Sequence, residues 1–270
     1  MMQLLESLVG PPVVVSELKH KPGRRRTLCA RGSRRTAIVK LYESDRVPVV
    51  AARLAALAAG PPEPQVPRVL HVDPIGRMLV LSALEGEPLR ASLVAGDLAD
   101  CTRAGQALAS WHHAWRHTHP VAFRPHAFAD ERRILLAQAA AAPPAIAAGV
   151  RARLAALKGS WTCTTVVHRD LYEEQILLGH RVGLIDLDDA ALGPPELDLG
   201  NLLAHAELLE LRAGGEVQRA IDALLAGYGA ASLDHALLDR CRKLAILRLA
   251  CIHRMPALLD RVPTREEVGV

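Results

Sequence analysis

Two short segments of the sequence carry polar residues at a spacing that packing alone does not explain. Val166-Val167-His168-Arg169-Asp170 is followed by Gln175, and Leu184-Ile185-Asp186-Leu187-Asp188 comes soon after. Each aspartate lies behind or inside an apolar run, where a carboxylate is costly to bury unless an ion or a donor compensates for it. Carboxylate and amide oxygens suit Mg²⁺. The segments therefore indicate phosphoryl transfer, which needs one carboxylate to orient a hydroxyl and oxygen ligands for the metal.

The elements around these residues are predicted from short apolar runs. VVH and ILL precede VGLID, with charged residues between them, so residues 164–188 read as short strands that flank a polar loop. Polar residues bracketed in this way often form a site. Downstream, PPELDLGNLLAH opens one of several stretches with helical apolar spacing.

The two halves of the chain have different patterns. Before residue 84, strand-like runs alternate with turn segments, and one helix is expected after Asp45, which is its predicted N-cap, with Pro48 in its first turn. After residue 85 the apolar spacing is mostly helical. The predicted strands are 13–18, 27–30, 37–42 and 78–82, and the predicted helices are 97–115, 128–140, 146–157, 197–211, 217–228 and 233–252.

Composition excludes several classes of protein. The 270 residues are half hydrophobic, which is enough for a sizeable core. The formal net charge of +4 is too small to indicate nucleic acid or a membrane surface as the partner. The five cysteines are scattered, without the short spacing of a zinc site. No stretch has the roughly 20 apolar residues of a membrane span, and no secretory signal is recognisable, so a cytoplasmic protein is expected.

The motifs resemble those of the aminoglycoside phosphotransferase and choline kinase superfamily. His168-Arg169-Asp170 with Gln175 is similar to its catalytic loop, and Ile185-Asp186-x-Asp188 to its metal-binding motif. The resemblance implies an α+β, two-lobed, protein-kinase-like fold, with an N-lobe over residues 1–84 and a C-lobe over 85–270. It also implies that Asp170 orients the acceptor hydroxyl, that Asp186 is the principal magnesium ligand, and that Gln175 stands where an asparagine is usual.

A nucleotide site follows from the same resemblance. The strand around Lys40 looks like the one that presents a lysine to the α- and β-phosphates, and the main chain from Ser82 to Leu84 looks like the adenine-binding hinge. The turn KHKPGRRR has one glycine, so contact with the phosphates falls partly to Arg24, Arg25 or Arg26. ATP and Mg²⁺ are the implied cofactors, with GTP as an alternative donor.

Two departures leave a second interpretation open. Gln175 is one methylene longer than asparagine, and the helix after Lys40 offers Arg53 but no acid to pair with the lysine, which leaves Glu43 or Asp45 as candidates. The first hypothesis is an enzyme that phosphorylates a small hydroxylated molecule, such as an aminoglycoside, an amino alcohol, a sugar or a hydroxy-amino acid. The alternative is a pseudokinase-like module that binds nucleotide for regulation without transferring phosphate.

Overall fold

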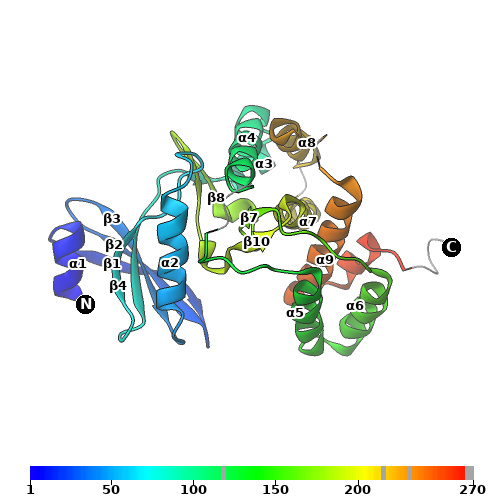
Figure 1. Ribbon diagram of the computed structural model, residues 1–270, viewed down its shortest axis with the longest axis horizontal. Coiled ribbons are helices and arrows are strands. Elements are labelled where there is room, and N and C mark those ends of the chain that lie inside the picture. The colour runs from blue at the N-terminus through cyan, green and yellow to red at the C-terminus, as the bar shows by residue number, and fades with distance from the viewer. Residues whose placement is uncertain (117–119, 214–216, 230, 232, 265–270) are drawn as a thin grey trace.

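A computed structural model describes residues 1–116, 120–213, 217–229, 231 and 233–264. The chain forms an α+β, two-lobed, kinase-like fold, in which an N-terminal antiparallel sheet adjoins a larger helical region (Figure 1). Within the described residues, no helix is both long and apolar enough to cross a bilayer.

The N-terminal sheet has five strands in the order β1-β2-β3-β5-β4, and all neighbours are antiparallel. Helices α1 (Met2–Val9) and α2 (Val47–Ala58) lie against its opposite faces (Figure 1). The strands are β1 (Val14–Lys21), β2 (Arg25–Arg31), β3 (Thr36–Tyr42), β4 (Val69–Asp73) and β5 (Met78–Ser82).

The alternation of side chains along β3 decides which of them reach the rest of the molecule. Ala37 and Val39 point to the face covered by α1, where they pack with Leu5 and Val9. Because successive side chains alternate between faces, Lys40 and Tyr42 do not share this face. The site residues of β3 are therefore directed toward the helical region.

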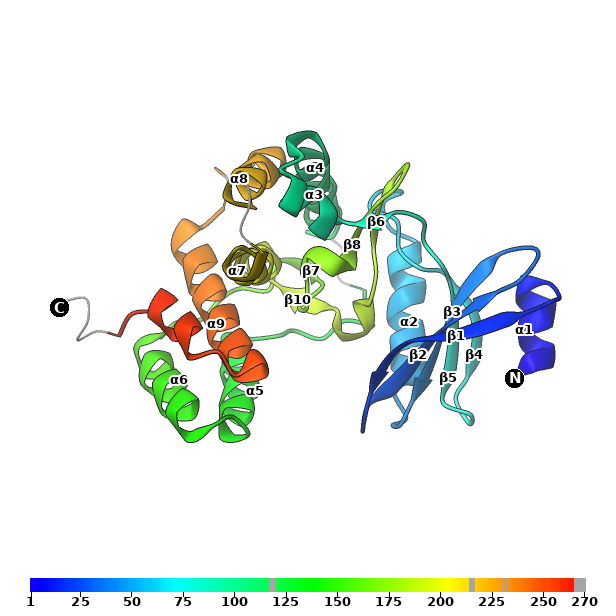
Figure 2. The same ribbon diagram turned by 180° about the vertical axis from the view of Figure 1, so that it is seen from behind.

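The helical region surrounds a long central helix, α7 (Pro195–Ala213), which packs along α9 (His235–His253), while α4 (Leu98–Ala114) packs on α8 (Val217–Tyr228) (Figure 2). The described residues also form α3 (Leu89–Ala95), α5 (Phe128–Ala140), α6 (Pro144–Ala156) and the 3₁₀ segments Glu173–Gln175, Leu187–Asp189 and Pro256–Arg261.

Short strands hold the chemical motifs between the two regions. β7 (Thr165–Val167) pairs with β10 (Ala191–Gly193), and β8 (Ile176–Leu178) pairs with β6 (Glu87–Pro88) and β9 (Val182–Leu184). The prediction of short strands flanking a polar loop is confirmed.

Most predicted elements are confirmed within a few residues, but several differences stand out. Helices α1 and α3 and strands β4, β6 and β10 were not predicted. The prediction that Asp45 caps α2 is wrong, because Arg46 occupies the N-cap position. The exposed carboxylate of Asp45 accepts a hydrogen bond from Nε of Arg77 at 2.8 Å instead.

Candidate active site

The buried carboxylate of Asp198 supports the loop that carries Asp170 by accepting hydrogen bonds from the loop's backbone. Oδ2 of Asp198 accepts the backbone N–H of His168 at 2.7 Å, and Oδ1 accepts that of Arg169 at 2.8 Å. Arg169 has a φ of 71°, a left-handed conformation that a non-glycine residue rarely adopts unless its surroundings enforce it. Asp198 thus supports this loop through its backbone, and the Asp170 side chain is left half exposed.

His168 connects the two motifs. Its Nε2 lies 2.7 Å from the carbonyl oxygen of Ile185, and its Nδ1 accepts the backbone N–H of Asp170 at 3.3 Å. Nε2 must therefore carry the proton. One imidazole thus fixes the position of the Asp170 loop relative to the strand end that presents Asp186.

Asp186 follows β9 in a strained, left-handed conformation with a φ of 63°. Both of its carboxylate oxygens lie 2.5 Å from Nη2 of Arg25, and Oδ1 lies 3.0 Å from Nζ of Lys40. Burial acts to raise the pKa of Asp186, but the two cations together lower it well below its ordinary value. The position therefore favours an ionised carboxylate that faces positive charge.

Asp188 is the buried partner of Lys40. Its Oδ1 lies 2.5 Å from the lysine Nζ, and its Oδ2 accepts the hydroxyl of Tyr42 at 2.8 Å and also contacts Arg25. Burial and the neighbouring Asp188 raise the pKa of Tyr42, so the phenol stays protonated and donates. Neither of the two acids considered from sequence, Glu43 and Asp45, pairs with Lys40.

Helix α2 is tied to the same segment by arginines. Arg46 pairs with the carboxylate of Asp189 at 2.5 Å, and Nη1 of Arg53 donates to the backbone carbonyl of Asp188 at 2.6 Å. The charges are reversed relative to the expected arrangement, because the helix supplies cations and the 186–189 segment supplies acids. The sheet, through Lys40, and α2, through its arginines, therefore both contact the 186–189 segment, although the helix contains no acid.

Lys40, Ser82 and Leu84, which were predicted to bind nucleotide, line one hollow of 510 Å³, whereas Arg24 does not. Apolar side chains such as Ile38 and Leu177 line the same hollow. The N–H of Ser82 already donates to the carbonyl of Arg68 at 2.8 Å, so Ser82 lines this hollow without offering that donor. The lining thus combines apolar side chains, which suit a flat base, with charged side chains, which suit phosphates.

Three adjoining hollows meet at the catalytic motifs. Asp186 lines both the 510 Å³ hollow and a small one of 40 Å³, and Asp170 lines both the small one and a third of 340 Å³. Arg24, an exposed side chain, also lines the small hollow. The two aspartates thus stand at the passage between two larger chambers.

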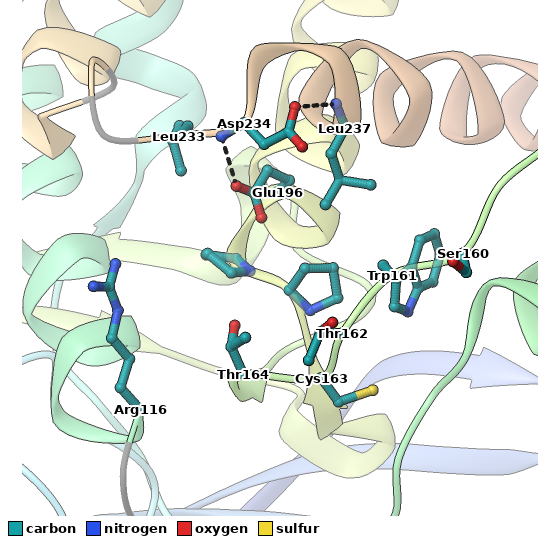
Figure 3. A pocket seen from close by; sticks show the side chains of 12 residues that line it. Arg116, Ser160, Trp161, Thr162, Cys163, Thr164, Glu196, Leu233, Asp234 and Leu237 are labelled. Atoms are coloured by element: carbon teal, nitrogen blue, oxygen red, sulfur yellow. Dashed lines mark hydrogen bonds between the residues drawn. The ribbon is translucent and has the colours of Figure 1, made fainter.

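A further hollow of 760 Å³ lies at the other end of β7, where Thr162 and Thr164 precede the strand (Figure 3). Its two acids are occupied: Glu196 accepts the backbone N–H of Asp234 at 3.0 Å, and Asp234 in turn caps α9 by accepting the N–H of Leu237 at 3.0 Å. Asp170 is not among its lining residues. Although this hollow is larger than the other three, it lies apart from Asp170.

The residues around Asp186 fit Mg²⁺ by the chemistry of their donors. The amide of Gln175 and the carboxylate of Asp186 line the same hollow, and both supply hard oxygen ligands. Over the described part of the chain, no three His, Cys, Asp or Glu side chains are grouped closely enough to hold a metal by themselves. A magnesium ion here would complete its coordination with phosphate oxygens and water, as it commonly does in kinases.

Sequence reasoning missed the roles of Arg25, Tyr42 and Asp188. Arg25 was named only as one of three arginines in the turn. The register of β2 on β3 places Arg25 opposite Tyr42 and Thr27 opposite Lys40, so all four share one face. Correct pairing of these two strands was the signal that could have found the cluster.

A model of the phosphotransferase enzyme family matches residues 24–244, a range that holds Lys40, Asp170 and Asp186. The chain belongs to this phosphotransferase family. A search of curated protein sequences gives no match. Together with the solved structures described next, this match confirms the predicted resemblance to the aminoglycoside phosphotransferase and choline kinase superfamily.

Solved structures share the fold of this family member at low sequence identity. An aminoglycoside phosphotransferase from Streptomyces rimosus has a TM-score of 0.67 and 22% identity, covering 93% of this chain and 96% of its own. Choline kinase from Cryptosporidium parvum has a TM-score of 0.65 and 11% identity, with coverage of 96% and 88%. A macrolide 2'-phosphotransferase from Brachybacterium faecium has a TM-score of 0.59 and 18% identity, with coverage of 97% and 94%.

Proposed function

We propose that this chain is a kinase that transfers the γ-phosphoryl group of ATP to a hydroxyl of a small molecule. The observation that carries the proposal is the placement of Asp170 and Asp186 in the passage between two chambers. Residues 1–84 would form the nucleotide-binding lobe, and residues 85–270 would supply the catalytic loop, the metal site and the acceptor-binding helices. ATP would occupy the 510 Å³ hollow and the acceptor the 340 Å³ hollow.

The proposed reaction is a single in-line transfer. The acceptor hydroxyl oxygen attacks the γ-phosphorus, the bond from that phosphorus to the bridging oxygen breaks, and ADP leaves with the electron pair. Asp170 accepts the hydroxyl proton as the new bond forms. The half-exposed Asp170 carboxylate is open to the acceptor chamber, which is the position such a role needs.

The remaining residues would bind and orient the donor. Lys40 would contact the α- and β-phosphates, with Ser82 and Leu84 beside the adenine and Arg24 near the terminal phosphate. Asp186 and Gln175 would hold Mg²⁺, which neutralises charge on the phosphates when bound. Arg25 now contacts Asp186, so we expect it to turn toward the phosphates when nucleotide and metal arrive.

The test is ADP release by purified protein with ATP, with and without Mg²⁺, across a panel of hydroxylated acceptors. Release that requires both an acceptor and the metal supports the kinase. Nucleotide binding without release across a broad panel would favour the pseudokinase-like module. GTP in place of ATP in the same assay decides the donor.

A further inference from the structure

The 340 Å³ hollow beside Asp170 is built from two helix faces and the catalytic loop. Leu208 and Leu209 of α7 and Leu249 of α9 give it an apolar floor. Its volume lies at the small end of ligand sites, which run from roughly 300 to 1,000 Å³. The chamber therefore suits a single small molecule better than a multi-ring one.

Basic side chains outnumber acidic ones around this chamber. The five basic residues lining it are Lys19, Lys21, Arg90, Arg212 and Arg248, and the three acidic residues are Asp170, Glu173 and Glu174. Its two histidines do not change this balance, because burial lowers the pKa of His205 to about 3 and also lowers that of His253. The chamber thus carries an excess of positive charge.

The acids that could oppose this charge are already engaged. Nη1 of Arg90 lies 3.6 Å from Glu174 and 3.9 Å from Glu173. Burial raises the pKa of Glu173. Among the described residues, Lys19, Lys21 and Arg212 have no carboxylate within ion-pair distance. Three cations at the chamber are therefore not paired with a carboxylate of the described residues.

Three other acids of the helical region lie outside the chamber. Glu207 pairs with Arg242 and, at 3.6 Å, with Arg261. Glu196 and Asp234 are used at the start of α9. None of these three lines the 340 Å³ hollow. Within the chamber a cationic acceptor would thus meet Arg212 and Arg248, and Asp170 itself lies 3.8 Å from Nη2 of Arg248.

We propose that the acceptor is a small anionic hydroxy compound, an inference that rests on the proposed function. Arg212 and Arg248 bind its carboxylate or phosphate while its hydroxyl faces Asp170. Nη2 of Arg248 lies 3.8 Å from Oδ1 of Asp170, so the anion-binding and hydroxyl-orienting groups are close enough for a short molecule. Arg248 is largely buried, its Nη1 lies 3.5 Å from Oε1 of Glu131, and its Nη2 donates to Asn201, so the guanidinium is held in place beside the chamber. Arg212 is exposed at the end of α7 and has room to close on the ligand.

The experiment uses two sets of related acceptor probes that differ in charge: gluconate, glucose and glucosamine, and glycerate with glycerol. Acceptor-dependent ADP release and calorimetric binding in the presence of ADP are measured side by side. The proposal expects the anionic member of each set to be favoured at least roughly tenfold in kcat/KM and in Kd, since hydrogen bonds to charged groups are the strong ones.

Charge reversal gives the specificity test. Arg212→Glu, at an exposed position that tolerates substitution, should remove the preference for gluconate and raise the relative use of glucosamine. Arg151→Glu, an exposed arginine of α6 outside the hollow, is the matched control and should change nothing. Phosphate-bearing glycerol 3-phosphate, run beside glycerate, separates the two kinds of anion.

Each outcome decides the proposal. Preference for anions that Arg212→Glu erases supports it. Preference for glucosamine, equal use of all members, or no binding of any probe overturns it, and the first two of these leave the kinase intact if ADP is released. Anion-selective binding without ADP release supports the charge inference while the proposed phosphoryl transfer fails.

Discussion

Lys40 and Asp188 form a buried ion pair in which Nζ lies 2.5 Å from Oδ1. The two residues are 148 positions apart, so the pair joins the N-terminal sheet to the segment that follows the second motif. It takes the place of a contact between Lys40 and helix α2. The sheet therefore positions Lys40 through the same segment that presents Asp186.

The first prediction concerns this pair. Asp188→Asn keeps the shape of the side chain but leaves Lys40 and Arg25 with one buried carboxylate fewer, which should lower the free energy of unfolding by about 3 kcal/mol. Urea denaturation measures the loss. Asp189→Asn is the control, because its pair with Arg46 is partly exposed and should cost less than about 1 kcal/mol. Equal losses of unfolding free energy in the two variants would show that the buried pair of Lys40 and Asp188 contributes no more than the exposed pair of Arg46 and Asp189.

A second prediction concerns competition between Arg25 and a metal for Asp186. Both oxygens of this carboxylate contact Arg25, so a divalent cation must displace the guanidinium. Arg25→Gln should bind Mn²⁺ in the absence of nucleotide roughly tenfold more tightly than the wild type, as measured by electron paramagnetic resonance. Asp186→Asn should abolish that binding. Unchanged Mn²⁺ affinity in Arg25→Gln would mean that Arg25 does not compete with the metal for the carboxylate of Asp186.

The third prediction tests the support under the catalytic loop. Asp198→Ala removes the acceptor for two backbone N–H groups, those of His168 and Arg169, and should lower the free energy of unfolding by about 3 kcal/mol. Turnover should fall more than ATP affinity. Asp97→Ala removes an exposed N-cap of α4 and should cost only about 1 kcal/mol, with full activity. A fully active Asp198→Ala protein would contradict this role.

The strands and long helices could be predicted because their apolar periods are regular. α1 was missed because it has only eight residues and lacks a side-chain cap, although Leu5 and Val9 are spaced to share a buried face. β4 was missed because its side chains are half-buried or exposed, so they carry no clear apolar alternation. Local pattern decides whether such short elements can be recognised.

The motif residues were found from sequence because their chemistry is local, whereas their partners depend on the fold. Asp170, Gln175 and Asp186 lie within 17 positions of one another. The pairing of Arg25 with Asp186 spans 161 positions and requires the strand register and the closure of the sheet on the helical region. Motif spacing identifies only residues that are close together in the sequence. This is why Glu43 and Asp45, and not Asp188, were considered as partners of Lys40.

The pH dependence of stability provides a fourth prediction. Burial lowers the pKa of His205 to about 3, whereas the unfolded chain binds that proton near pH 6.5. The unfolded state is therefore favoured as pH falls below 6.5, and by pH 5 this group should have removed about 2 kcal/mol of stability. His205→Gln lacks the titrating group, so its loss between pH 7 and pH 5 should be smaller by that amount in urea denaturation. Equal losses of stability between pH 7 and pH 5 in the wild type and in His205→Gln would contradict the lowered pKa of His205.

The central claim, that Asp170 orients the acceptor hydroxyl for phosphoryl transfer, is tested most directly by Asp170→Asn. The variant keeps the size of the side chain but cannot accept the proton, so kcat should fall by roughly 10²- to 10⁴-fold. ATP affinity, measured by calorimetry on the same preparation, should stay unchanged, because Asp170 does not line the 510 Å³ hollow. Near-wild-type turnover in Asp170→Asn, with an acceptor that the wild-type protein phosphorylates, would contradict the account.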